Sequence, residues 1–183
     1  MITDYSLRLA ENQQRLAVGA AATDHLIDLQ DARNIALGEP LYAVISITED
    51  YTADALGDAL ISWQFYQSVN TSKTDIASAI ELGSTKAYSV NFSGLLPRNL
   101  HKGQRISLAL SPMTVTSTDT TAANTLTTAG ARYIYGVVTV ATDPFTAGKF
   151  TIDICTQAML GGSYGGAAGY SDIPVYPTGI TIA

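Results

Sequence analysis

Residues 61–66 read Ile-Ser-Trp-Gln-Phe-Tyr, and the large apolar side chains Ile61, Trp63 and Phe65 occupy every second position. Because successive side chains of a β-strand point to opposite faces, this alternation predicts a strand with one buried face. A lone Trp in such a row is more often a core residue than a platform on which a sugar stacks. We therefore expect Trp63 to lie in the core.

The same alternation recurs along the chain and predicts further strands. The residues expected to face inward are Leu41, Ala43, Ile45 and Ile47; Tyr88, Val90 and Phe92 within 86–92; Ile106, Leu108 and Leu110; and Phe150, Ile152 and Ile154. The stretch 132–140 is apolar on both sides and rich in Val and Tyr, which predicts a central strand covered on both faces. A helix is conceivable for 50–60, but the stretch is short, and we expect a loop or a single turn.

Turn signals separate these stretches, at Gly38-Glu39-Pro40, Gly83-Ser84, Asp143-Pro144 and Ala147-Gly148. Roughly seven or more strands at this spacing predict an all-β single domain, a jelly roll or β-sandwich with extended N- and C-terminal arms. We expect an N-terminal arm or first strand over 1–22 and the sandwich over 23–159. A Thr/Ala-rich surface loop is predicted at 114–130, and a Gly/Tyr-rich C-terminal arm at 160–183. Such a tail often orders only against a neighbouring chain.

Composition and charge exclude several classes of function. The 183 residues are 46% hydrophobic and 14% charged, with ten basic residues and a net charge of −6. Gripping phosphates needs clustered Lys and Arg, so direct nucleic-acid binding is not expected. The single cysteine, Cys155, excludes an intramolecular disulfide and a Cys-based metal cage. The start of the chain lacks the pattern of a signal peptide, and no apolar run approaches the ~20 residues that span a bilayer. We expect synthesis in a cytoplasm and no membrane partner.

No catalytic, cofactor or metal site is predicted, and the chain is not expected to be an enzyme. For each residue type that could carry chemistry, we expect a structural or solvated role. These residues are His25 and His101; Glu49, Asp50, Asp54 and Asp58; Cys155; and the glycines within 161–166. No nucleophile-elbow pattern accompanies the histidines, and the acidic residues lack the spacing of a calcium loop. Cys155 has no basic neighbour in sequence to lower its pKa, and the glycines lack the Lys-Ser/Thr pair of a phosphate loop.

Three motifs carry a resemblance to a known family. Residues 27–35 read Ile-Asp-Leu-Gln-Asp-Ala-Arg-Asn-Ile and lead into 38–42, Gly-Glu-Pro-Leu-Tyr. Residues 96–100, Leu-Pro-Arg-Asn-Leu, precede the alternating stretch 102–110, and residues 143–150 read Asp-Pro-Phe-Thr-Ala-Gly-Lys-Phe. Together they resemble the capsid cement (decoration) proteins of short-tailed phages, the group that includes the jelly-roll cement protein of the Bordetella phage head. The resemblance covers roughly residues 1–50 and 95–160; the Thr-rich insert and the Gly/Tyr tail depart from it.

The resemblance implies a jelly-roll domain on the outer capsid surface of a virion, bridging neighbouring capsomers without enzymatic activity. Its partners would be the major capsid protein and a second copy in a homodimer, with a trimer left open. From the residues, candidate contacts are spaced apolar and aromatic side chains near the termini and in the last turn: Tyr5, Leu7, Leu9, Phe145, Tyr164, Tyr170 and Tyr176. Phe145 would more often stabilise its turn than make a contact.

Two rival functions remain open from the sequence. A carbohydrate-binding jelly roll on a virion would need solvent-facing aromatics, for which Tyr42, Tyr66 and Tyr88 are the candidates. A hydrolase using the carboxylates of Asp50 and Asp58 is the weaker alternative.

Overall fold

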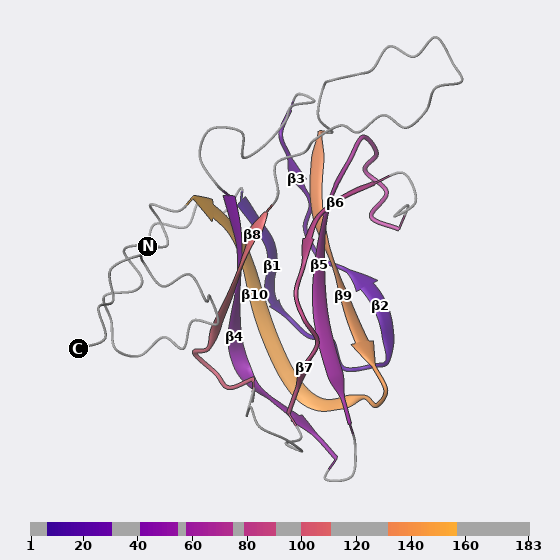
Figure 1. The fold of residues 1–183 in the computed structure, drawn as a ribbon, viewed down its shortest axis with the longest axis vertical. Helices are drawn as coiled ribbons and strands as arrows, with labels where there is room; N and C mark the ends of the chain where they lie inside the picture. The colour runs from indigo at the N-terminus through magenta and orange to yellow at the C-terminus, as the bar shows by residue number, and fades with distance from the viewer. Residues whose placement is uncertain are drawn as a thin grey trace, which may run out of the picture.

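The computed structural model describes residues 7–30, 41–54, 58–74, 79–90, 100–110 and 132–156, and these form two antiparallel sheets packed face to face (Figure 1). Sheet A has the order β1-β10-β4-β8 and sheet B the order β2-β9-β5-β6, with β3 paired to β9 and β7 to β5. The prediction of an all-β sandwich is confirmed. The strands of sheet A are β1 (Arg8–Gln13), β10 (Phe145–Thr156), β4 (Leu41–Ala53) and β8 (Arg105–Leu110). Those of sheet B are β2 (Gly19–Ala22), β3 (Ile27–Asp28), β9 (Tyr133–Ala141), β5 (Leu60–Ser68), β6 (Ile80–Ser84) and β7 (Tyr88–Ser89).

Each edge of sheet B is one interrupted strand. Both β2 and β3 pair with β9, and both β6 and β7 pair with β5. Thr23 bridges the first interruption, because its N–H donates to the Gly136 carbonyl and its hydroxyl accepts from the Gly136 N–H. Counting each interrupted edge once reduces ten strands to eight. In chain order these eight lie as 1-8-3-6 in sheet A and 2-7-4-5 in sheet B.

The core lies between the two sheets and contains most of the residues expected to face inward. Trp63 is fully buried, and its ring meets Tyr88 and Phe150 edge-on at centroid distances of 5.9 and 5.7 Å. The core placement of Trp63 is therefore confirmed, as is the inward face of β5. The other predicted residues buried there are Ala43, Ile45 and Ile47; Ile61 and Phe65; Ile106 and Leu110; and Phe150, Ile152 and Ile154.

Strand β9 is buried on both faces, as its apolar sequence predicts. Ile134, Val138 and Val140 belong to the core between the sheets, whereas Tyr135 and Val137 pack with Tyr66 on the outer face of sheet B. Leu26 and Ala79 lie against this outer group. The Lys73 ammonium donates to the carbonyls of Thr23 and Asp24, which ties the connection after β5 to the edge of the sheet. The chain thus covers part of sheet B with its own loops.

Several predicted boundaries are wrong. Residues 50–53 continue strand β4 and form neither a loop nor a turn, and the strand expected over 86–92 is confined, among the described residues, to β7. Gly83-Ser84 and Ala147-Gly148 were expected to be turns, but they lie inside β6 and β10. The strand register shifts close to both glycines. Opposite β6 it shifts between Phe65 and Tyr66 of β5, and on β10 it shifts on either side of Ala147. Glycine marks an irregular pairing here, since bulges also favour glycine.

The sandwich begins earlier than expected. Strands β1 and β2 fall within 1–22, where an N-terminal arm or first strand was expected, and they belong to sheets A and B. Gln13 fastens the two sheets along this edge: its side-chain N–H₂ donates to the Ala22 carbonyl at 3.1 Å, and its oxygen accepts from the Asp24 N–H. The predicted loop at 114–130, the arm at 160–183 and the turn at 38–40 lie outside the described residues.

Replacing Gly148 with Ala should destabilise the sandwich. A Cβ at Gly148, where φ is +138°, would clash with three carbons of the Tyr51 ring, which is buried and packed edge-on against Phe145. Overpacking and the positive φ together should lower the free energy of unfolding by about 2–4 kcal/mol. Gly103→Ala is the matched control, because Gly103 also has a positive φ but open space around its Cα. Equal losses in urea unfolding of the two variants would contradict the ring clash.

The ion pair between Asp28 and Arg132 should lower the pKa of the Asp28 carboxyl by a measurable amount. The Arg132 Nε and Nη2 atoms donate to the two carboxylate oxygens at 2.6 and 2.7 Å. These bonds, with a bond from the Gln30 N–H, lower the pKa of Asp28 from 3.8 to about 2. Because the folded pKa is depressed, the pair stabilises the fold above about pH 4 and loses its effect as pH falls towards 2. Carboxyl NMR titration should show the Asp28 pKa returning towards 3.8 in Arg132→Gln; an unchanged pKa would contradict the assignment.

Candidate functional site: the outer face of sheet A

The outer face of sheet A is the surface that β10 and β4 turn away from the core. In β10 the core residues Phe150, Ile152 and Ile154 alternate with Thr151, Asp153 and Cys155, which therefore point to this outer face. All three alternate residues are nevertheless buried. A sheet face in contact with water is usually polar and exposed, so burial at these positions marks the face as unusual.

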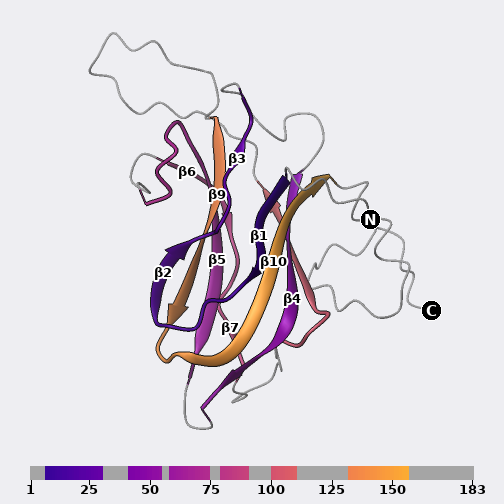
Figure 2. The same ribbon diagram turned by 180° about the vertical axis from the view of Figure 1, so that it is seen from behind.

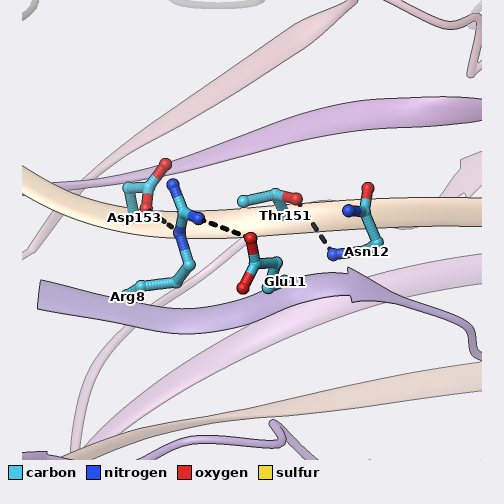
Figure 3. Close-up of polar contacts among 5 residues, drawn as sticks. All are labelled: Arg8, Glu11, Asn12, Thr151 and Asp153. Atoms are coloured by element: carbon cyan, nitrogen blue, oxygen red, sulfur yellow. Dashed lines mark hydrogen bonds and ion pairs between the residues drawn. The ribbon is translucent and has the colours of Figure 1, made fainter. Parts of the chain in front are cut away.

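A charged group lies on this face where β1 begins (Figure 3). The Arg8 Nε donates to Asp153 at 2.8 Å, and its Nη1 donates to Glu11 at 3.0 Å. The two side chains of the first pair are 17% and 7% exposed, whereas that of Glu11 is 43% exposed. Arg8 and Asp153 are direct register partners of β1 and β10, so the pair braces the two strands where β1 begins.

Next to this pair, β1 is distorted and held by a side-chain hydrogen bond. Asn12 has a φ of +48°, which Asn tolerates better than most residues, and the β1–β10 register shifts between Ala10 and Gln13. The Asn12 N–H donates to the hydroxyl of Thr151 at 3.1 Å (Figure 3). A side chain of β10 thus satisfies a backbone donor that the irregular pairing leaves without a ladder partner.

An apolar cluster occupies the end of the face where β10 ends. Tyr42 and Val44 of β4 pack with Cys155 of β10, and we call these three residues the outer apolar cluster. Burial and, to a smaller extent, the neighbouring Asp153 carboxylate raise the pKa of the Cys155 thiol to about 11. The thiol is therefore protonated near neutral pH, which makes it a poor nucleophile and agrees with its predicted role as a small packed residue.

A polar groove occupies the opposite end of the face. Both of its carboxylates already have partners: Glu49 lies 2.6 Å from the Lys149 Nζ, and Asp50 accepts from the Lys102 backbone N–H with His101 3.7 Å away. None of its described lining residues is aromatic, so these residues give a sugar ring no stacking surface. The lining residues are Asn12, Thr48, Glu49, Asp50, Thr52, Lys102, Ala147 and Lys149.

The acidic residues singled out in the sequence are not brought together as a reactive pair. Glu49 and Asp50 line the polar groove with the partners just given, whereas the Asp58 N–H donates to Asp143 at 2.9 Å, which ties the start of β5 to the turn after β9. Within the described ranges, no group of three or more His, Cys, Asp or Glu side chains could hold a metal ion. The backbone N–H of His25 donates to the Leu9 carbonyl at 2.9 Å.

The predicted contact residues near the termini divide into three groups. Leu9 and Phe145 are buried, at 0% and 3% exposure, so their side chains are core residues and present no contact surface. Leu7 is partly buried against the same core. Tyr5, Tyr164, Tyr170 and Tyr176 lie outside the described residues. The tyrosines required by a glycan-binding surface are also buried: Tyr42 at 8%, Tyr66 at 6% and Tyr88 at 4%.

Sequence reasoning missed that β1 begins and β10 ends at the same end of one sheet. The two strands are antiparallel neighbours, with Arg8 paired to Asp153, so the chain enters β1 and leaves β10 side by side (Figures 1 and 2). Residues 1–6 and 157–183 are therefore attached to adjacent strands. The signal that could have revealed this is the pairing of the first and last strands, which alternation within either strand does not specify.

Comparison with known proteins assigns no family. No protein-family model matches the chain, and no curated protein matches it. In the part of the chain that the structure describes, no helix is long and apolar enough to cross a membrane.

Asp153→Asn should weaken the fold more than the corresponding change in Glu11. Both carboxylates accept from Arg8, but only Asp153 is buried, so its replacement removes the buried carboxylate that pairs with a part-buried guanidinium. We expect a loss of about 1.5–3 kcal/mol in the free energy of unfolding. For the exposed control Glu11→Gln we expect less than about 1 kcal/mol. Denaturant unfolding of both variants measures the difference, and a larger loss in Glu11→Gln would contradict it.

Proposed function

We propose that this protein is a structural, non-enzymatic decoration protein that binds the outer surface of a tailed-phage head and bridges neighbouring capsomers. The observation that carries the proposal is the exit of both terminal segments from one braced end of a rigid sandwich. Arg8 and Asp153 join β1 and β10 at that end. Both segments are attached to one end of the sandwich, a geometry suited to binding two neighbouring surfaces.

The strand order supports the jelly-roll form of the sandwich. The eight strands lie in the orders 1-8-3-6 and 2-7-4-5. Strands that follow one another in the chain therefore mostly lie in opposite sheets. This is the arrangement of two interlocked Greek keys, which an eight-stranded jelly roll contains. The form agrees with the resemblance of the three sequence motifs to capsid cement proteins.

The mechanism of stabilisation is linkage. A protein that binds only the assembled, expanded shell lowers its free energy by RT ln(1 + [L]/Kd), about 2.7 kcal/mol per site at 100 Kd. Repeated over a shell, modest contacts oppose the pressure of packaged DNA. A homodimer that touches two capsomers adds avidity without a large interface on either side; a trimer would act in the same way. The net charge of −6 favours an outer position, away from the DNA phosphates.

The carbohydrate-binding alternative has less support. It requires aromatic rings open to solvent, and the three tyrosines that could have supplied them are buried, while Trp63 lies in the core. The polar groove offers hydrogen-bonding groups but no aromatic lining residue.

Binding to heads is tested with the full chain and DNA-filled heads of the encoding phage that lack it. We expect the protein to co-sediment with these heads in saturable amounts, and the occupied heads to release DNA at a higher temperature than bare heads. Unexpanded shells are the control, since linkage requires weaker binding to them. Failure to co-sediment with full heads, or equal DNA-release temperatures at saturation, would overturn the proposal.

A further inference from the structure

Strands β2 and β3 form one edge of sheet B, where backbone groups point away from the sheet. N–H and C=O groups alternate between the two sides of an extended strand. The Thr23 N–H donates to the Gly136 carbonyl of β9. The N–H groups of Ala20, Ala22 and Asp24 therefore point away from β9. Outward groups of this kind are what a strand of another molecule binds when it adds to a sheet edge.

Strand β2 carries none of the features that usually protect a sheet edge. Edge strands in natural proteins commonly contain charged side chains, proline or bulges, which hinder the addition of a further strand. The sequence of β2 is Gly-Ala-Ala-Ala, and its pairing with β9 is regular from Gly19 to Ala22. Ala20 is exposed, and its methyl group is too small to screen the backbone. Protection of this edge therefore has to come from another element.

The side-chain amide of Gln13, the last residue of β1, occupies outward groups at the end of β2. Its nitrogen donates to the Ala22 carbonyl at 3.1 Å, and its oxygen accepts from the Asp24 N–H at 3.3 Å. These two groups flank Thr23 on the side away from β9, and the N–H and C=O of an added strand would bind the same pair. One side-chain amide thus takes the place of a neighbouring strand.

Further hydrogen bonds satisfy the backbone in the interruption between β2 and β3. The Lys73 ammonium donates to the carbonyls of Thr23 and Asp24. The His25 N–H donates to the Leu9 carbonyl of β1. The interruption is therefore bonded both to β1, in sheet A, and to the connection after β5. Within this set of bonds, the amide of β1 is the one that covers a donor and an acceptor at the open side of the edge.

We propose that Gln13 is an edge guard: its side-chain amide occupies hydrogen-bonding groups at the β2 edge of sheet B and prevents a strand of a second copy from adding there. Pairing with β10 fixes the position of this residue, because Gln13 lies opposite Phe150 in the β1–β10 register. A neutral amide both donates and accepts, whereas a Lys ammonium only donates and a Glu carboxylate only accepts. Loss of the amide would leave the Ala22 carbonyl and the Asp24 N–H open to another strand.

A second copy of the chain is the partner that the open edge would take. Two β2 strands related by a twofold axis can pair antiparallel, so that each supplies the groups that the other lacks. The alanine side chains of β2 bring neither charge repulsion nor bulk to such a pairing. Sheet B would then continue from one molecule into the next. The guard acts on this edge alone, so a homodimer of the kind proposed above would have to form through another surface.

Gln13→Ala in the full chain tests the guard by sedimentation equilibrium over a range of protein concentrations. Its apparent mass should rise with concentration to about twice the wild-type mass or more, because the opened edge pairs with that of a second copy. Gln14→Ala is the matched control, since it removes the same side chain from the exposed neighbouring position and should keep the wild-type mass. A wild-type mass for folded Gln13→Ala at every concentration would overturn the proposal.

Three further variants separate the guard from a general loss of stability. Gln13→Asn keeps the amide on a shorter side chain that does not reach the edge, so it should associate and stands in for Gln13→Ala if that variant does not fold. Gln13→Lys places a charge at the edge and should keep the wild-type mass. Gly148→Ala is destabilised elsewhere and should keep it too. Equal association of Gln13→Lys or Gly148→Ala would overturn the proposal. No capsid protein enters this experiment, so its outcome is independent of the proposed decoration function.

Discussion

The pairing of β10 with β4 is the constraint on which the rest of the structure depends. It runs from Phe145 opposite Ala53 to Thr156 opposite Leu41, and so joins the last described strand to one about a hundred residues earlier. Such a long-range pairing closes a large loop, and burial of side chains from both strands must offset that entropy. Ile45, Ile47, Phe150 and Ile152 supply this burial on the core side. The first strand, β1, adds to the sheet only because β10 is present.

The irregular start of β10 allows this strand to bend as it enters sheet A and pairs with β4. Its register against β4 shifts three times between Phe145 and Phe150, and the strand curves strongly in this part (Figure 2). Gly148 allows the close approach of the Tyr51 ring, while the Phe145 N–H donates to the Leu16 carbonyl at 2.9 Å. These contacts carry the chain from the turn after β9, in sheet B, into sheet A without a long connection. Bulges commonly bend strands in this way.

The sequence predicted side-chain alternation well and pairing poorly, for a physical reason. The inward positions of Ile61, Trp63 and Phe65 follow from geometry within one strand, which the sequence contains completely. Whether Gly83 or Gly148 marks a turn or an irregular pairing depends on the partner strand, which local residues do not specify. Leu9 and Phe145 were assigned to contacts because they lie near a terminus and a turn, but the partners that bury them are distant in sequence.

The candidate site was harder to predict, since it consists of relations between strands. Asp153 alternates with core isoleucines, which places it on the outer face but does not specify what lies against it. Its partner, Arg8, lies 145 positions away, and only the β1–β10 register brings the two together. The lack of basic neighbours predicts that Cys155 is a small packed residue. Its packing partners Tyr42 and Val44 lie on β4, and only the β10–β4 register brings the three together.

The two ends of the outer face of sheet A have opposite requirements for a binding partner. At the polar groove, Glu49 and Asp50 already have partners in Lys149 and the Lys102 N–H, so a surface that displaced water there would have to preserve or replace those bonds. At the other end, a partner would compete with whatever excludes water from Tyr42. Because Tyr42, Val44 and Cys155 are already buried, they offer a partner no apolar surface to cover.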